Sequence, residues 1–162
     1  MSDKKDYIQK AWVLSGLPGS GKTTWAKKRT SLKTVIISRD SIREMLSGKY
    51  KVNSKLENLV LQIAKKSVSL ALKEGFNIII DETCLTKKTR LRWLKLIKKI
   101  NKRCRCILVI FPETKNNLKF RMRSPKGLSK RVWQRVINKM KKIMQEPSLK
   151  EGWDLIIKKT TF

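Results

Sequence analysis

A glycine-rich segment that ends in lysine and threonine carries the clearest chemistry in this chain. Residues 16–23 read Gly-Leu-Pro-Gly-Ser-Gly-Lys-Thr, which matches the phosphate-binding pattern G-x-x-x-x-G-K-[ST]. In this pattern backbone N–H groups surround the phosphates, the lysine reaches the β- and γ-phosphates, and the threonine hydroxyl ligates Mg²⁺. We therefore expect ATP and Mg²⁺ as cofactors. The residues expected to contact the nucleotide are Gly16, Leu17, Pro18, Gly19, Ser20, Gly21, Lys22, Thr23 and Thr24.

The elements around this segment are those that such a loop requires. An apolar stretch at 11–15 predicts a strand before it, and residues 22–29 predict a helix after it. Further apolar stretches predict strands at 34–38, 77–81, 105–111 and 153–157. Because helices alternate with these strands, we expect one α/β domain over residues 1–162, with a parallel sheet of about five strands and helices on both faces. Residues 1–9 form a polar tail in this interpretation.

Capping residues delimit the predicted helices. Asn53 or Ser54 begins a long helix, Thr86 begins a basic one, and Ser129 begins the last one. The predicted helices cover residues 40–47, about 54–74, about 87–101, 115–123 and about 130–146.

The charge balance points to a polyanionic partner. Forty Lys and Arg face twelve Asp and Glu, which gives a formal net charge of +28. A compact domain with this charge repels itself, so we expect nucleic acid as a partner, bound through many phosphate contacts. The alternative is a lysine-rich surface that reflects genome composition or keeps the protein soluble.

Cysteine content and hydropathy indicate the compartment. Cys84, Cys104 and Cys106 form no obvious disulfide pair, which favours a reducing, intracellular and cytoplasmic location. No apolar run approaches membrane-spanning length, so no membrane partner is expected.

Carboxylates are the candidate proton acceptors, because the chain has no histidine. Ligands of parallel sheets bind beyond the carboxyl ends of the strands. The acids expected there are Asp40, Asp81, Glu82 and Glu113. Asp81 follows Ile-Ile-Ile, as in a Walker B strand, and would hold Mg²⁺ directly or through water. Asp40 is either a helix N-cap or a catalytic base, and Arg43 shares its helix face at i, i+3. Glu57 is assigned to an exposed helix side.

Together these motifs resemble the kinase domain of phage-type polynucleotide 5′-hydroxyl kinases, within the P-loop kinases. Besides the glycine-rich loop, the resemblance includes Ser38-Arg-Asp-Ser-Ile-Arg43, Ile80-Asp-Glu-Thr-Cys-Leu85, a basic segment at 119–131 and a closing Glu-Pro…Glu-Gly-Trp-Asp-Leu-Ile segment at 146–156. It covers most of the chain. It implies a P-loop kinase fold and transfer of the γ-phosphate of ATP to the 5′-OH end of DNA or RNA.

The resemblance also implies roles for particular residues. Asp40 would be the general base on the 5′-OH, and Arg43 would bind the adjacent phosphate. Arg39 and Thr83 would be further substrate contacts, and Thr23 with Asp81 or Glu82 would form the metal site. Segment 119–131 would form a lid over the ATP phosphates. The cations assigned to catalysis are Lys22, Arg121, Arg123 and Lys126. The family commonly has Asn where Cys84 stands.

Two other functions explain part of these observations. A small-molecule P-loop kinase, acting on a nucleoside, an antibiotic or a sugar-nucleotide, would share the loop and Asp40 but would not need a charge of +28. An ATP-driven switch that binds nucleic acid would not need Asp40 and Arg43 at one sheet edge. Tryptophans could stack on bases. We expect Trp12 and Trp133 in the core and leave Trp25 and Trp93 open.

Overall fold

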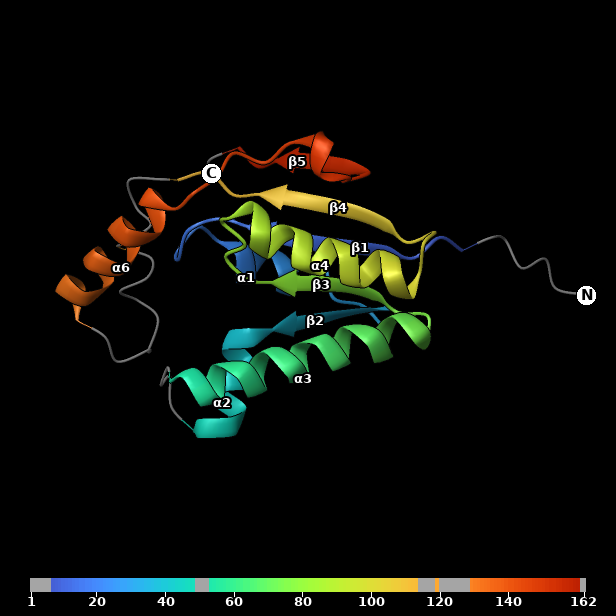
Figure 1. Cartoon of the computed structure of the whole chain (residues 1–162), viewed down its shortest axis with the longest axis horizontal. Coiled ribbons are helices and arrows are strands. Elements are labelled where there is room, and N and C mark those ends of the chain that lie inside the picture. The colour runs from blue at the N-terminus through green and yellow to red at the C-terminus, as the bar shows by residue number, and fades with distance from the viewer. Residues whose placement is uncertain (1–6, 49–52, 114–118, 120–128, 161–162) are drawn as a thin grey trace, which may run out of the picture.

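Among the residues that the structure describes, five parallel strands form one sheet through the middle of the protein (Figure 1). The computed structural model describes residues 7–48, 53–113, 119 and 129–160. The strands are β1 (Lys10–Ser15), β2 (Thr34–Ser38), β3 (Asn77–Asp81), β4 (Arg105–Ile110) and β5 (Leu155–Lys158), in the spatial order β2-β3-β1-β4-β5. Every neighbouring pair is parallel. The predicted parallel α/β sheet is therefore confirmed.

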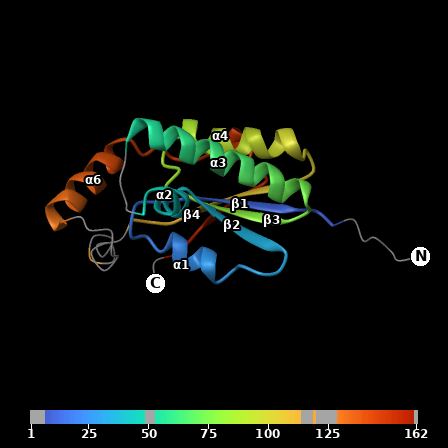
Figure 2. The same ribbon diagram turned by 90° about the horizontal axis from the view of Figure 1, so that it is seen from below.

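Helices cover both faces of the sheet, but unequally (Figure 2). The long helices α3 (Ser54–Lys73) and α4 (Lys87–Ile100) lie on one face, and the short helix α1 (Lys22–Lys27) lies on the other. The buried residues of α3 recur every four positions, which keeps them on one side of the helix: Val60, Ala64, Val68 and Leu72. On the α1 face the rings of Trp25 and Phe111 meet edge to face, with centroids 6.0 Å apart.

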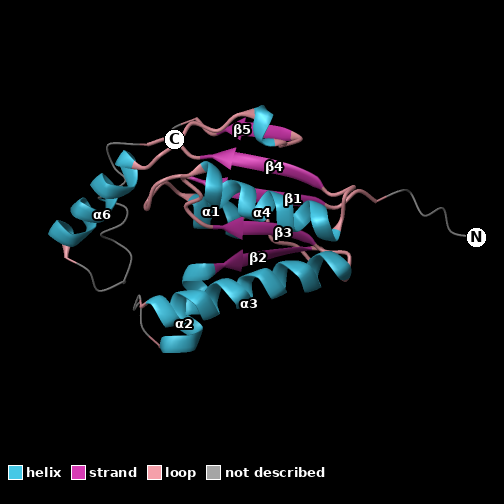
Figure 3. Cartoon of the chain, in the orientation of Figure 1, coloured by secondary structure: helices cyan, strands magenta, loops and turns pink. Residues whose placement is uncertain are grey.

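The carboxyl ends of the strands carry the remaining helices (Figure 3). Helix α2 (Arg39–Ser47) follows β2 directly, and α6 (Lys130–Lys142) lies beyond the sheet edge. Ile137 of α6 forms a small buried cluster with Leu17 of the phosphate loop and Leu85 of the loop after β3. This cluster packs α6 against the loop that the sequence assigns to ATP.

A buried ion pair joins α4 to the C-terminal segment. Arg90 is fully buried, and its Nη2 and Nε lie 2.6 and 2.9 Å from the two carboxylate oxygens of Glu151, which belongs to the 3₁₀ turn η1 (Leu149–Glu151). Arg90 also donates to the carbonyl oxygens of Leu85 and Gln145. Trp153 donates to the same Glu151 carboxylate at 3.0 Å. The guanidinium therefore connects the loop after β3 with the chain that follows α6.

Side-chain caps begin most helices, as the sequence predicts. Asn53 caps α3, Thr86 forms a capping box on α4, and Ser129 caps α6. Helix α2 is capped by Ser38, whose hydroxyl accepts the N–H of Ser41, the third residue of the helix. Asp40 is therefore not the N-cap, and the alternative prediction that it serves only to cap this helix is wrong.

Three predicted boundaries are wrong by two to four residues, and the largest error is in the last helix, because α6 ends at Lys142 and not at about residue 146. Helix α1 ends at Lys27, because the N–H of Arg29 turns back to Ala26 in a tight i→i−3 contact. Strand β5 begins at Leu155, because Asp154 accepts the Cys106 N–H with its side chain and so precedes the regular pairing. The helix predicted at 115–123 lies almost entirely outside the described residues.

Candidate active site

The phosphate loop lies between β1 and α1, and its last glycine begins the helix. Gly21 is the N-cap of α1, with a φ of 89°, and no side chain caps this helix. The first backbone N–H groups of a helix have no intrahelical acceptor, which makes such an end suitable for an anion. The Lys22 ammonium donates to the carbonyl oxygens of Gly16 and Leu17, at 2.8 Å each. The Lys22 cation thus lies over the loop. Together with the first N–H groups of α1, it can bind the phosphates of ATP.

Gly16 fixes this loop against the neighbouring strand ends. Its N–H donates to the Thr83 carbonyl at 2.9 Å. A Cβ at this position would lie 2.9 Å from both the Phe111 Cβ and the Ser20 Oγ, closer than van der Waals contact allows. The first glycine of the pattern is therefore required by the close approach of the loop to the end of β4.

The threonine of the loop contacts the acid at the end of β3. The Thr23 hydroxyl donates to Asp81 Oδ2 at 2.8 Å, and Asp81 is 7% exposed. Within the described ranges no group of three or more Asp, Glu, Cys or His gathers as a metal cage. Mg²⁺ typically keeps several waters and takes one or two protein oxygens plus substrate phosphates. The pair Thr23 and Asp81 fits that mode of binding.

Glu82 has different surroundings from Asp81, because neighbouring residues at a strand end point in opposite directions. Its carboxylate accepts the indole N–H of Trp93 at 3.0 Å, and its other oxygen lies 3.3 Å from Arg39 Nη1. The Cys84 thiol contacts the same group at 3.6 Å. Of the two adjacent acids that the sequence leaves open, Asp81 is therefore the one beside Thr23.

A second charged cluster joins α2 to α3. Arg43 is 6% exposed, and its Nη1 donates to Asp40 Oδ1 at 2.6 Å. Its Nε and Nη2 contact the two oxygens of Glu57 at 2.5 and 3.0 Å, and Arg39 Nη2 reaches Glu57 at 2.6 Å. We call Arg39, Asp40, Arg43 and Glu57 the α2–α3 cluster. Through Arg39 it also reaches Glu82.

Glu57 is the functional candidate that the sequence reasoning missed. The expectation that it lies on an exposed helix side is wrong, since its side chain is 22% exposed and binds two guanidinium groups. An acid in the first turn of α3 is expected in any case, because it stabilises the positive end of the helix dipole. The presence of Glu57 in the sequence therefore does not indicate a functional role. Only the packing of α2 against α3 brings it to Arg43.

The ion pairs of this cluster keep both partners charged. The hydrogen bond to Glu57 raises the pKa of Arg43 above its ordinary value, against the lowering effect of burial, and Asp40 adds to the rise. The hydrogen bond from Arg43 lowers the pKa of Glu57 below 4.5. The Cys84 thiol differs, because burial and then the nearby Glu82 raise its pKa well above 9.0.

A cleft of about 280 Å³ separates α1 from the β2–α2 connection. Thr23 and Asp81 lie on its wall, with Lys27 from α1 and with Ser38 and Ser41 from the α2 side. Ser38 and Ser41 flank Arg39 and Asp40 in the sequence, but the four residues of the α2–α3 cluster do not line this cleft. The cleft therefore gives access to the Thr23–Asp81 pair from the side of the β2–α2 connection.

The remaining predicted residues divide into three groups. Thr83 contributes its backbone carbonyl to Gly16. Trp25 and Trp93 are 8% and 0% exposed, so neither is a platform for base stacking. The lid cations lie outside the described residues: Arg121, Arg123 and Lys126.

The position where the family commonly has Asn adopts an unusual backbone. Cys84 has a φ of 38°, in the left-handed region that Asn tolerates better than most residues. Its carbonyl accepts the Ser15 hydroxyl at 3.0 Å. The backbone requirement therefore explains an Asn preference without any substrate contact.

Comparison with known proteins agrees with this geometry. A family described as AAA domain matches residues 12–147. A chain in the structure of the Pnkp1/Rnl/Hen1 RNA repair complex aligns with a TM-score of 0.69 at 23% identity, over 94% of this chain and 48% of that one. A chain in a second structure of the Pnkp1/Rnl/Hen1 complex aligns with a TM-score of 0.59 at 27% identity, over 79% of this chain and 43% of that one. Kti12 of Chaetomium thermophilum, in complex with ADP-AlF3, aligns with a TM-score of 0.56 at 17% identity, over 91% of this chain and 87% of that one.

The chain belongs to the AAA domain family, because the match covers most of its length. It has the fold of a P-loop kinase, and its resemblance to the P-loop domain of polynucleotide kinases is confirmed. It spans less than half the length of the matched chains in the two Pnkp1/Rnl/Hen1 structures. The fold implies nucleotide binding. No helix in the described ranges is long and apolar enough to cross a membrane.

Proposed function

We propose that this protein is an ATP-dependent polynucleotide 5′-hydroxyl kinase. The observation that carries the proposal is that the α2–α3 cluster begins at the same carboxyl end of the sheet as the phosphate loop, and that Arg39 reaches Glu82, the residue after Asp81. A carboxylate held by an arginine, one helical turn apart, is a suitable base next to an acceptor that itself carries a phosphate. The net charge of +28 supports nucleic acid as that acceptor.

Each residue of the site has a defined task in this proposal. Asp40 accepts the proton of the 5′-hydroxyl, and its side chain is 45% exposed and so open to an incoming group. Arg43 orients Asp40 and attracts the phosphate next to the reacting hydroxyl. Glu57 holds Arg43 and Arg39 in place. Preorganised charges of this kind need no rearrangement when the reaction occurs.

The phosphate loop and the metal-type pair act on the donor side. ATP would supply the transferable phosphoryl group, and Mg²⁺ would neutralise its charge. Lys22 and the first N–H groups of α1 would bind the phosphates, while Thr23 and Asp81 would hold the metal through their oxygens. The same proposal assigns the lid cations Arg121, Arg123 and Lys126 to the phosphates of ATP.

The nucleic acid class rests on charge and on similarity. The matched Pnkp1/Rnl/Hen1 chains belong to an RNA repair complex, which supports RNA or DNA ends as acceptors here. Because Arg43 and Arg39 would contact phosphate and not base edges, we expect little dependence on sequence. We further propose an intracellular, reducing location, since the three cysteines are free and buried.

One assay separates this function from its alternatives. ATP labelled on the γ-phosphate is offered with 5′-hydroxyl oligonucleotides, with nucleosides or with water alone. We expect label on the oligonucleotide at a much higher rate than on nucleosides. A small-molecule kinase would label nucleosides or other small acceptors best, and an ATP-driven switch would release inorganic phosphate without labelling any acceptor.

A further inference from the structure

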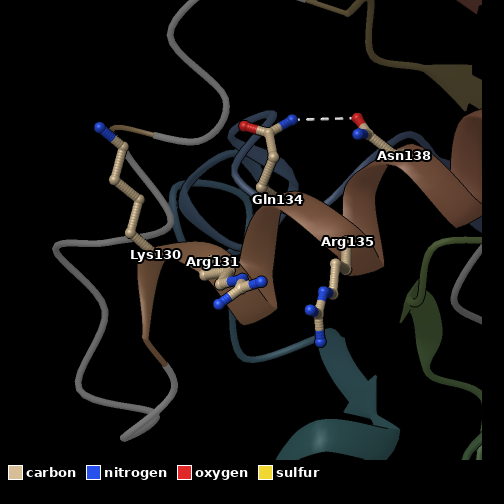
Figure 4. A pocket seen from close by; sticks show the side chains of 5 residues that line it. All are labelled: Lys130, Arg131, Gln134, Arg135 and Asn138. Atoms are coloured by element: carbon tan, nitrogen blue, oxygen red, sulfur yellow. Dashed lines mark hydrogen bonds between the residues drawn. The ribbon is translucent and has the colours of Figure 1, made fainter.

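The exposed face of α6 carries a basic groove (Figure 4). It has a volume of about 450 Å³, and the described residues that line it are Lys130, Arg131, Gln134, Arg135 and Asn138. Lys130 and Arg131 end the basic segment 119–131, but the cations of that segment assigned to the ATP phosphates are Arg121, Arg123 and Lys126, so no residue of the groove is itself assigned to the nucleotide. We propose that this groove, which we call the α6 groove, binds the sugar–phosphate backbone of the acceptor strand downstream of its 5′ nucleotide. This inference rests on the proposed function and extends it to the length of the acceptor.

The charges of the α6 groove are not explained by the stability of the helix. Lys130 and Arg131 stand in the first turn, at the positive end of the helix dipole, and that turn contains no acid. Cations there destabilise a helix. In the described part of the chain, no carboxylate forms an ion pair with these two residues or with Arg135, whereas Lys141 of the same helix pairs with Glu113. An external anion would satisfy all three cations.

The spacing of the side chains suits a phosphate chain. Arg131 and Arg135 are four residues apart, so their Cα atoms lie about 6 Å apart along the helix axis. This is close to the separation of successive phosphates along a nucleic acid strand, and each guanidinium can bind one phosphate through two N–H groups. Gln134 donates to Asn138 Oδ1 at 2.9 Å, as the dashed line in Figure 4 shows. This bond leaves the Gln134 oxygen and the Asn138 nitrogen to face a sugar or a base.

The α6 groove has a fixed position relative to the phosphate loop. On the opposite side of α6, Trp133 and Ile137 are each 3% exposed, and Ile137 packs with Leu17 and Leu85. Helices α6 and α2 lie at the same end of the sheet (Figure 1), and α2 carries Arg39, Asp40 and Arg43. A strand whose 5′ end lies at Asp40 and continues along this edge would therefore reach the α6 groove.

The test compares two double variants that remove the same charge. Arg131→Ala/Arg135→Ala removes both guanidinium groups from the α6 groove. Lys95→Ala/Lys99→Ala removes two exposed cations with the same i, i+4 spacing from α4. Binding of a fluorescent 5′-hydroxyl oligonucleotide is measured by anisotropy over a salt series, without ATP. We expect the arginine variant to lose about tenfold in affinity, and its log K against log salt slope to become shallower by about 1.4, at about 0.7 per phosphate contact on a single strand. The lysine variant should keep the wild-type slope.

Kinetics with two acceptors complete the test. In the arginine variant, the KM for an oligonucleotide should rise about tenfold, whereas the KM values for ATP and for a nucleoside 3′-monophosphate should stay within about twofold. An equal loss in the lysine variant would show a net-charge effect only, and a rise in the KM for ATP would assign the arginines to the nucleotide. Either result, or an unchanged salt slope in the arginine variant, would contradict the proposal that the α6 groove binds the acceptor strand. Binding needs no phosphate transfer, so an inactive protein that still shows the predicted slopes would refute the kinase function alone.

Discussion

Replacing Glu57 by Gln should damage the acceptor side of the site and leave the donor side intact. The carboxylate makes three contacts, two to Arg43 and one to Arg39, at 2.5 to 3.0 Å. A glutamine keeps the shape, but its NH₂ group faces a guanidinium, so part of these contacts is lost. Hydrogen bonds to charged groups contribute about 1.5–3 kcal/mol each, and partial exposure of Glu57 reduces that value. We expect a loss of about 2 kcal/mol in transition-state stabilisation.

This loss corresponds to about a 30-fold decrease in kcat/KM for a 5′-hydroxyl oligonucleotide. Steady-state transfer of labelled phosphate measures it, with the KM for ATP as the internal reference, which should change by less than about twofold. Glu44→Gln, the same change at an exposed position of α2, is the control. A Glu57→Gln enzyme with wild-type kcat/KM would refute the idea that Glu57 positions the arginines, and a parallel rise in the KM for ATP would indicate general disruption.

Three further results are expected. Arg90→Met leaves the Glu151 carboxylate buried without its partner, so unfolding free energy should fall by about 3–5 kcal/mol, measured by denaturant titration; a loss below about 1 kcal/mol would contradict the importance of this pair. Asp81→Asn keeps the bond from Thr23 but removes the charge, so the Mg²⁺ concentration for half-maximal activity should rise about tenfold or more, and an unchanged requirement would exclude Asp81 from the metal site. Because the pKa of Glu57 is lowered below 4.5 in the folded protein, its contribution to stability is complete above pH 4.5 and is lost as the pH falls through the lowered value. The difference in melting temperature between wild type and Glu57→Gln should therefore be constant above pH 4.5 and should become smaller as the pH falls below 4.5. A difference that becomes larger in acid would contradict a lowered pKa of Glu57.

Local signals explain why most of the fold could be predicted. The strands are continuous apolar runs, and the caps Thr86 and Ser129 mark their helices with hydrogen bonds that the sequence pattern already contains. The phosphate loop is likewise a local motif, since its chemistry depends on residues within eight positions. These features need no knowledge of packing.

Contacts between distant segments explain what could not be predicted. Glu57 reads as an ordinary first-turn acid, and its role depends on α3 packing against α2. The Walker B pattern favours Asp81, but the resemblance leaves Asp81 and Glu82 as alternatives for the metal. Only the opposite directions of their side chains separate the Thr23 contact from the Arg39 and Trp93 contacts. Trp93 could not be placed because its burial depends on the fit of α4 to the sheet. Residue types alone contain none of this information.

Phosphate transfer by wild type and by Asp40→Asn, to one oligonucleotide with either a free or a phosphorylated 5′ end, tests the central proposal most directly. Asparagine keeps the size of Asp40 and the contact to Arg43 but cannot accept the hydroxyl proton. We predict that wild type labels only the free 5′ end, and that Asp40→Asn binds ATP normally but transfers at least about a hundredfold more slowly, as expected for loss of a general base. Label on the blocked oligonucleotide, or transfer by Asp40→Asn near the wild-type rate, would contradict the proposed kinase mechanism.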